Sequence, residues 1–132
     1  AIEEMLRYNP AFVQMRRTVA KDVELEGQAL KAGDKMILNW HGMNHDPDVF
    51  PNPTQFDVTR AISMPDLANQ HRAFGIGEHF CIGAHLARLE MRVMFEEIVP
   101  RLRNPRFAAP VQFVRDYFVN GIKSMPITFD PA

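Results

Sequence analysis

The only cysteine in the chain, Cys81, lies in a glycine-rich stretch that leads into a long helical pattern. Backbone N–H groups in the first turn of a helix have no intrahelical partners, so they can stabilise negative charge on a nearby sulfur. Gly77 allows the loop to turn with positive φ, and Gly83 allows the backbone to approach a cofactor without an intervening side chain. A thiolate presented in this way suits a flat metal cofactor. We interpret Cys81 as the axial ligand of a haem iron.

Other chemistries fit the same stretch less well. A dinucleotide fingerprint needs a third glycine at the position that Phe80 occupies here. His79, Cys81 and His85 are possible zinc ligands, but structural zinc usually takes four ligands in paired spacing and no fourth is evident. A buried cysteine without any ligand is common. The glycines around Cys81 argue against that role.

The spacing of this stretch resembles the haem-binding signature of the cytochrome P-450 family, the haem-thiolate monooxygenases. The matching residues are Phe74, Gly77, His79, Cys81 and Gly83, followed by Ala87-Arg88-x-Glu90. The resemblance implies haem b (iron protoporphyrin IX) with an axial thiolate ligand, which favours O–O cleavage. It implies that the following residues bind the cofactor: Phe74, Gly75, Gly77, His79, Cys81, Gly83 and Arg17.

The resemblance also assigns roles to single side chains around the cofactor. Phe74 is expected to pack beside the sulfur and to keep water from it. His79 matches a family position that donates to a haem propionate, and Arg17, five residues before Asp22, matches an arginine that pairs with one. Arg16 would point to the opposite face of a strand, so Arg17 is the preferred candidate.

Glu4 and Arg7 lie three residues apart in a helix predicted over residues 2–8, which Asn9-Pro10 ends. An exposed pair at this spacing contributes only about 0.2–0.5 kcal/mol. The pair resembles the family's Glu-x-x-Arg motif, in which it is buried and anchors the segment before the cysteine loop. The family adds a third cation from a Pro-x-Arg-Phe sequence. Here Gln55 stands at that position, so the source of the third cation is left open.

Two apolar pairs are implied to line a substrate pocket. Phe12 and Val13 follow the first helix, and Phe118 and Val119 precede the last strand of the chain. Packing in a core would explain the same residues. Their apolar character suggests a hydrophobic substrate such as a lipid, sterol or terpenoid.

The surrounding elements follow from periodicity and from turn residues. Alternating or extended runs at 23–26 and 36–38 predict a β-hairpin or meander, and residues 40–46 predict a short helix. The proline-rich residues 46–71 resemble the family's meander. Beyond it we expect a helix from Ile82 to about Leu102 with a broad buried face, an extended segment at 107–113, and a terminal hairpin of strands 117–122 and 125–129.

The fold class is therefore α+β, mainly α in the parent enzyme. Residues 1–132 are expected to be the C-terminal haem-binding portion of one larger P-450 domain, because the chain begins inside a helix without an initiator Met. Its parts would be the Glu-x-x-Arg helix, β-hairpins, meander, cysteine-ligand loop, long helix and terminal β-hairpin.

Charge and composition narrow the function further. The net charge is -1 with both signs interspersed, which excludes a nucleic-acid partner. No apolar run approaches the ~18 residues of a membrane span. A single cysteine fits the reducing cytoplasm.

The resemblance implies a soluble bacterial enzyme that inserts one oxygen atom from O2 into its substrate, with electrons from a ferredoxin or flavoprotein donor. The chain alone is expected to be inactive. Three alternatives remain: a haem-thiolate peroxygenase or isomerase, a non-enzymatic haem sensor, and a zinc-bound structural domain.

Overall fold

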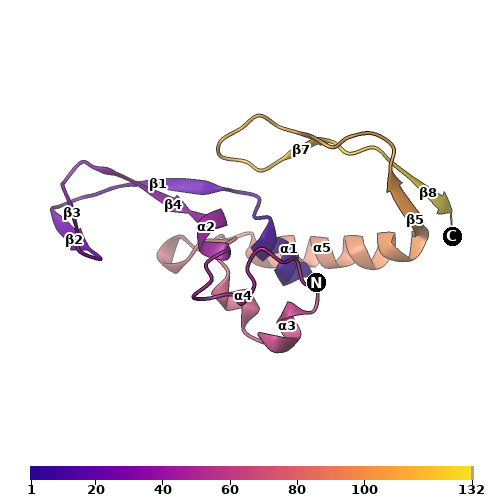
Figure 1. Cartoon of the computed structure of the whole chain (residues 1–132), viewed down its shortest axis with the longest axis horizontal. Coiled ribbons are helices and arrows are strands. Elements are labelled where there is room, and N and C mark those ends of the chain that lie inside the picture. Colours follow the sequence, from indigo (N-terminus) through magenta and orange to yellow (C-terminus); the bar gives the residue numbers. More distant parts are fainter. Residues whose placement is uncertain (132) are drawn as a thin grey trace.

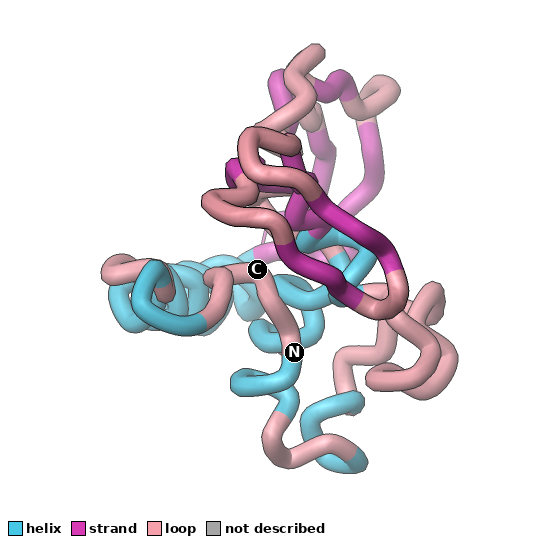
Figure 2. The backbone as a smooth tube through the Cα atoms, turned by 90° about the vertical axis from the view of Figure 1, so that its left-hand side faces the viewer, coloured by secondary structure: helices cyan, strands magenta, loops and turns pink. Residues whose placement is uncertain are grey.

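The computed structural model describes residues 1–131 and shows a helical base from which two β arms extend (Figure 1). The tube view confirms that the strands lie together on one side of the helices (Figure 2). The helices are α1 (Ile2–Tyr8), α2 (Trp40–Asn44), α3 (Arg60–Ser63), α4 (Leu67–Gln70) and α5 (Ala84–Ile98), with short 3-10 turns η1 (Gly77–His79) and η2 (Val99–Arg101). Within the described residues, none of these helices is long and apolar enough to cross a membrane.

The centre of the helical base is α1, which contacts α2, α3, α4 and α5. The predicted first helix is confirmed: it ends at Tyr8, and Asn9 caps it before Pro10. The short helix within residues 40–46 is also confirmed, and the side chain of Asn39 caps it by accepting the Gly42 N–H at 2.9 Å.

Each β arm contains two antiparallel pairs, one nested inside the other. The first arm pairs β1 (Gln14–Thr18) with β4 (Lys35–Asn39) and β2 (Val23–Leu25) with β3 (Gln28–Leu30). The second pairs β5 (Leu102–Phe107) with β8 (Ile127–Pro131) and β6 (Gln112–Phe113) with β7 (Ile122–Ser124). The extended runs at 23–26 and 36–38 are therefore strands, but each pairs with a different partner.

The predicted terminal hairpin of 117–122 with 125–129 is wrong. The chain reverses around Asp116, whose carboxylate accepts the backbone N–H groups of Phe118 at 2.6 Å and Val119 at 3.0 Å. The Val114 N–H then donates to the Gly121 carbonyl at 2.9 Å. Pro126 lies between β7 and β8 and does not reverse the chain. It cannot donate a backbone hydrogen bond, but its carbonyl still accepts the Ala108 N–H at 2.9 Å.

The predicted long helix is also shorter and less buried than expected. It spans Ala84–Ile98, and residues 102–107 are already a strand. Only Ala84 of this helix is buried, whereas Leu86, Leu89 and Val93 are 59%, 48% and 49% exposed. The apolar stripe exists, but nothing in the described chain covers it.

Polar or charged side chains make up half of the buried residues among those that the structure describes, and Pro10 is one of the apolar half. The buried hydrophobic residues are Trp40, Phe50, Leu67 and Ala84, while Glu4, Arg7, Asn44, Arg60 and His71 are equally inaccessible. The accessible surface is 9852 Å², whereas a compact protein of 15.1 kDa would expose roughly 7,100 Å².

Residues 1–132 expressed alone should therefore bind the dye ANS and unfold without a cooperative transition, because the exposed apolar stripe of α5 has no partner. Dye fluorescence and near-UV circular dichroism measure this directly. A cooperative two-state transition with native-like haem affinity would contradict the prediction.

Candidate functional site

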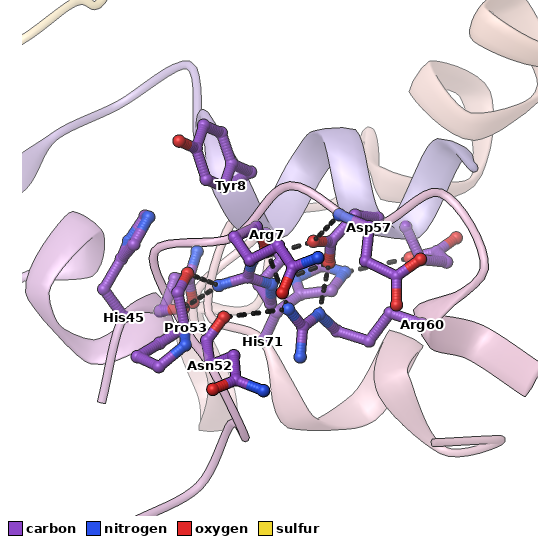
Figure 3. Close-up of polar contacts among 12 residues, drawn as sticks. Arg7, Tyr8, His45, Asn52, Pro53, Asp57, Arg60 and His71 are labelled. Carbon is purple, nitrogen blue, oxygen red and sulfur yellow. Dashed lines mark hydrogen bonds and ion pairs between the residues drawn. The ribbon is translucent and has the colours of Figure 1, made fainter. Parts of the chain in front are cut away.

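A buried ion cluster joins α1 to the loop before α3, and Figure 3 shows Arg7 and Arg60 within it. Glu4 is its central anion, and we call Glu4, Arg7 and Arg60 the Glu4 cluster. The Glu4 carboxylate accepts two hydrogen bonds from Arg7, from Nε at 2.7 Å and from Nη2 at 2.8 Å. Arg60 Nε adds a third at 3.0 Å, and the Asp57 backbone N–H a fourth at 3.0 Å. The cation that Gln55 does not supply thus comes from Arg60. The backbone carbonyl of Gln55 accepts from both arginines, at 3.3 Å and 2.9 Å.

The second positive charge of this cluster is compensated by backbone carbonyls. Arg7 donates to the carbonyl of Asn44 at 2.6 Å, and Arg60 donates to that of Pro51 at 2.6 Å. Burial would raise the pKa of Glu4, but the hydrogen bonds from Arg7, from the Asp57 backbone and from Arg60 outweigh it, and the pKa is lowered. The carboxylate is therefore held ionised at the centre of the cluster.

Sequence reasoning did not identify Arg60 as part of this cluster. It lies five residues beyond Gln55, at the first position of the four-residue helix α3. The available signal was the only arginine within the proline-rich residues 46–71. Only the folded loop brings its guanidinium to Glu4.

A second cluster, also missed, surrounds Glu3. The carboxylate accepts from Arg88 Nε at 2.8 Å and Nη2 at 3.0 Å, and it pairs with His71 Nε2 at 2.9 Å. Arg88 had been noted only as part of the matching sequence pattern. We call Glu3, His71 and Arg88 the Glu3 cluster.

Acid should weaken the Glu3 cluster in the complete enzyme. Burial would raise the pKa of Glu3, but hydrogen bonds from His71 and Arg88 outweigh it and lower the pKa to about 2 from 4.5. A depressed carboxyl pKa stabilises the fold above pH 4.5, and this contribution is lost as the pH falls toward 2. The shift corresponds to ~3 kcal/mol at most, and screening by solvent at a side chain 23% exposed reduces it to ~1–2 kcal/mol.

Thermal unfolding of wild type and Glu3→Gln between pH 7 and pH 4 tests this. The difference in unfolding temperature should be largest at pH 7 and should shrink below about pH 5, because the unfolded carboxyl then becomes protonated. A difference that stays constant or grows as the pH falls would count against it.

The cysteine loop is closed by its own backbone. The Cys81 N–H donates to the Phe74 carbonyl at 2.9 Å, and Gly75 and Gly77 turn the loop with φ of 75° and 74°. The helix does not begin at Ile82 as expected: residues 82–83 form a turn, and α5 begins at Ala84. A Cβ on Gly83 would lie 3.8 Å from the Cys81 sulfur, so this glycine keeps the space beside the sulfur clear.

The loop presents its sulfur to solvent between apolar side chains. The Cys81 thiol is exposed, and the large apolar side chains of Phe80 and Ile82 on either side of it are exposed too. An accessible sulfur between apolar neighbours fits one axial bond to a flat macrocycle. No group of three or more His, Cys, Asp or Glu able to hold a metal occurs among residues 1–131, so the zinc alternative gains no support.

The predicted pocket residues come together from the two ends of the chain. The rings of Phe12 and Phe118 lie 4.8 Å apart, and the Val13 N–H donates to the Phe118 carbonyl at 3.0 Å. Val119 forms a β-bridge with Phe12. These contacts tie the segment after α1 to the chain reversal at Asp116.

An open groove of about 690 Å³ lies beside this junction. Arg16 and Arg17 both line it and both are exposed, so the preference for Arg17 stays a prediction. His79 is exposed in η1, and its role stays a prediction too. The other residues that line the groove are Gln14, Met15, Ile37, Asp116, Tyr117 and Phe118.

Comparison with known proteins identifies the family to which this fold and this cysteine loop belong. The model of the cytochrome P450 family matches residues 1–105. This chain therefore belongs to the cytochrome P450 family. It is 39% identical to cytochrome P450-terp of a Pseudomonas species, over 99% of the chain and 29% of that protein. It is 42% identical to a steroid C26-monooxygenase of Mycolicibacterium smegmatis, over 100% of the chain and 32% of that protein.

Solved structures show the same relation. The crystal structure of CYP108D1 from Novosphingobium aromaticivorans matches with a TM-score of 0.88 and 43% identity, over 99% of this chain and 30% of that one. The described residues thus form part of the P450 fold, with helices and strands mixed. The chain spans about a third of the length of the relatives it matches.

Proposed function

We propose that residues 1–132 are the C-terminal haem-binding portion of a soluble, bacterial-type cytochrome P450 monooxygenase of the cytoplasm. The observation that carries this proposal is the exposed Cys81 sulfur on a loop closed by the Phe74 carbonyl and turned by two glycines. Haem b, bound through the Cys81 thiolate, would supply the activation of O2 for the insertion of one oxygen atom into a substrate.

The residues of this chain hold and shield the cofactor in this proposal. Phe74, whose carbonyl accepts the Cys81 N–H, would pack beside the sulfur, and the lack of a side chain at Gly83 would let the backbone lie close to the macrocycle. His79 and Arg17 would bind the haem propionates, since each is an exposed side chain able to donate to a carboxylate. The Glu4 cluster keeps α1 and the loop before α3 in fixed positions.

The substrate is proposed to be a hydrophobic molecule, with a lipid, sterol or terpenoid as the classes to test. The contact between Phe12 and Phe118 supports an apolar pocket formed by the segments that carry them, Val13 and Val119 included. Relatives named as a steroid C26-monooxygenase, a linalool 8-monooxygenase and a methyl-branched lipid omega-hydroxylase support the same classes. A ferredoxin or flavoprotein would deliver the electrons. We expect no turnover from residues 1–132 alone, because oxygen activation and most of the pocket would need the rest of the enzyme.

The test is made on the complete enzyme. Its reduced form under CO should show the absorption band of a thiolate-ligated haem. With NAD(P)H, a ferredoxin or flavoprotein donor and O2, it should convert panels of terpenes, sterols and fatty acids into hydroxylated products. Absence of haem would refute the proposal. A thiolate-ligated haem that forms product only with peroxide would instead indicate a peroxygenase, and one that forms no product would indicate a sensor.

A further inference from the structure

The Glu3 cluster links three separate parts of the chain and contacts the first residue of the cysteine loop, Phe74. Glu3 belongs to α1, Arg88 to α5, and His71 lies at the end of α4. The side chain of His71 is 1% exposed, and those of Glu3 and Arg88 are 23% and 21% exposed. Three largely buried ionisable groups need a reason to be there, because burying charge is costly unless each charge is paired.

Hydrogen bonding fixes the arrangement of the cluster. The Ala73 backbone N–H donates to His71 Nδ1 at 3.3 Å, so the proton of the neutral ring is on Nε2, which donates to Glu3 at 2.9 Å. The two bonds from Arg88 to the Glu3 carboxylate are parallel, which orients the plane of the guanidinium. Its orientation is therefore set by Glu3 and, through Glu3, by His71.

The guanidinium of Arg88 then contacts the cysteine loop. Its central carbon lies 4.7 Å from the centre of the Phe74 ring, a cation–π distance. The Phe74 carbonyl accepts the Cys81 N–H at 2.9 Å. A continuous series of contacts thus runs from Glu3 through Arg88 and Phe74 to the backbone of the cysteine.

We propose that Glu3, His71 and Arg88 are positioning residues, which hold Phe74 and through it the Cys81 loop in the conformation that ligates haem. This rests on the proposed function, because it concerns the loop that would carry the haem ligand. It differs from the role of the Glu4 cluster, whose hydrogen bonds lie within α1, the end of α2 and residues 51–60 and do not involve Phe74.

The experiment compares Arg88→Gln, Phe74→Leu and the double variant in the complete enzyme. The readout is the rate at which the ferrous–CO complex loses its thiolate-ligated absorption band. Each single variant should raise this rate roughly tenfold, as expected for the loss of a partly desolvated cation–π contact. In the Phe74→Leu background, Arg88→Gln should cause no further increase, because Arg88 acts through the ring. Arg88→Lys keeps the charge and tests the paired geometry if Arg88→Gln does not fold.

A matched control is an exposed arginine–glutamate ion pair at the C-terminal end of α5. Arg101 pairs with Glu97 at 2.6 Å, but both are exposed, so Arg101→Gln should leave the band unchanged. Additive effects of Arg88→Gln and Phe74→Leu would overturn the proposal, as would a stable band in Arg88→Gln. Absence of the band in the wild type would instead refute the proposed function.

Discussion

Replacing Cys81 by alanine in the complete enzyme should abolish the thiolate-ligated ferrous–CO band and all oxygen insertion. The exposed sulfur is the single soft ligand on the loop, because Cys81 is the only cysteine of the chain. Haem content, the ferrous–CO spectrum and product formation measure the effect.

His85→Ala is the matched control for this prediction. His85 is an exposed residue four positions further along, in the first turn of α5. Its removal should leave the spectrum intact. A Cys81→Ala enzyme that retains both the pigment and the thiolate-type band would refute the assignment of the ligand, whatever its activity.

Replacing Glu4 by glutamine should destabilise the complete enzyme by about 3–5 kcal/mol, the usual cost of stranding a buried charge. Here the loss strands two guanidinium groups, because Arg7 and Arg60 both bond to the same carboxylate. Glutamine keeps the shape of the side chain but offers one acceptor oxygen and no charge. We expect a large drop in unfolding temperature and in the yield of haem-loaded protein.

Asp22→Asn provides the comparison for Glu4→Gln. Asp22 pairs with Lys31 at 2.8 Å, a similar distance, but both side chains are exposed on the first β arm. The unfolding temperature of this variant should match that of the wild type. If Glu4→Gln also unfolds like the wild type, the cluster does not anchor α1 as we propose.

The two ion clusters together explain how α1 is held in place in a chain that buries few hydrophobic side chains. Adjacent residues of α1, Glu3 and Glu4, contact different segments: Glu3 reaches α5 and the end of α4, and Glu4 reaches the loop before α3. Because the hydrophobic core is small, directional hydrogen bonds to charged groups set these positions. Each cluster therefore determines where one flanking segment lies relative to α1.

Local sequence determined the elements whose geometry depends on neighbouring residues. Proline at position 10 predicted the end of α1, and glycine at position 77 predicted the positive φ of the cysteine loop. The spacing around Cys81 also indicated the family, because that pattern is short and contiguous. The effects of this proline and this glycine are steric, and the Cys81 pattern is contiguous, so none of them needs information from distant parts of the chain.

Tertiary structure decided the features that depend on distant partners. Arg60 joins Glu4 across 56 positions and Arg88 joins Glu3 across 85, and no local pattern indicates which arginine a carboxylate will meet. The pairing of β7 with β6 and of β8 with β5 likewise depends on where the chain reverses. The periodicity of α5 fixed which face is apolar, but whether that face is buried depends on what packs against it.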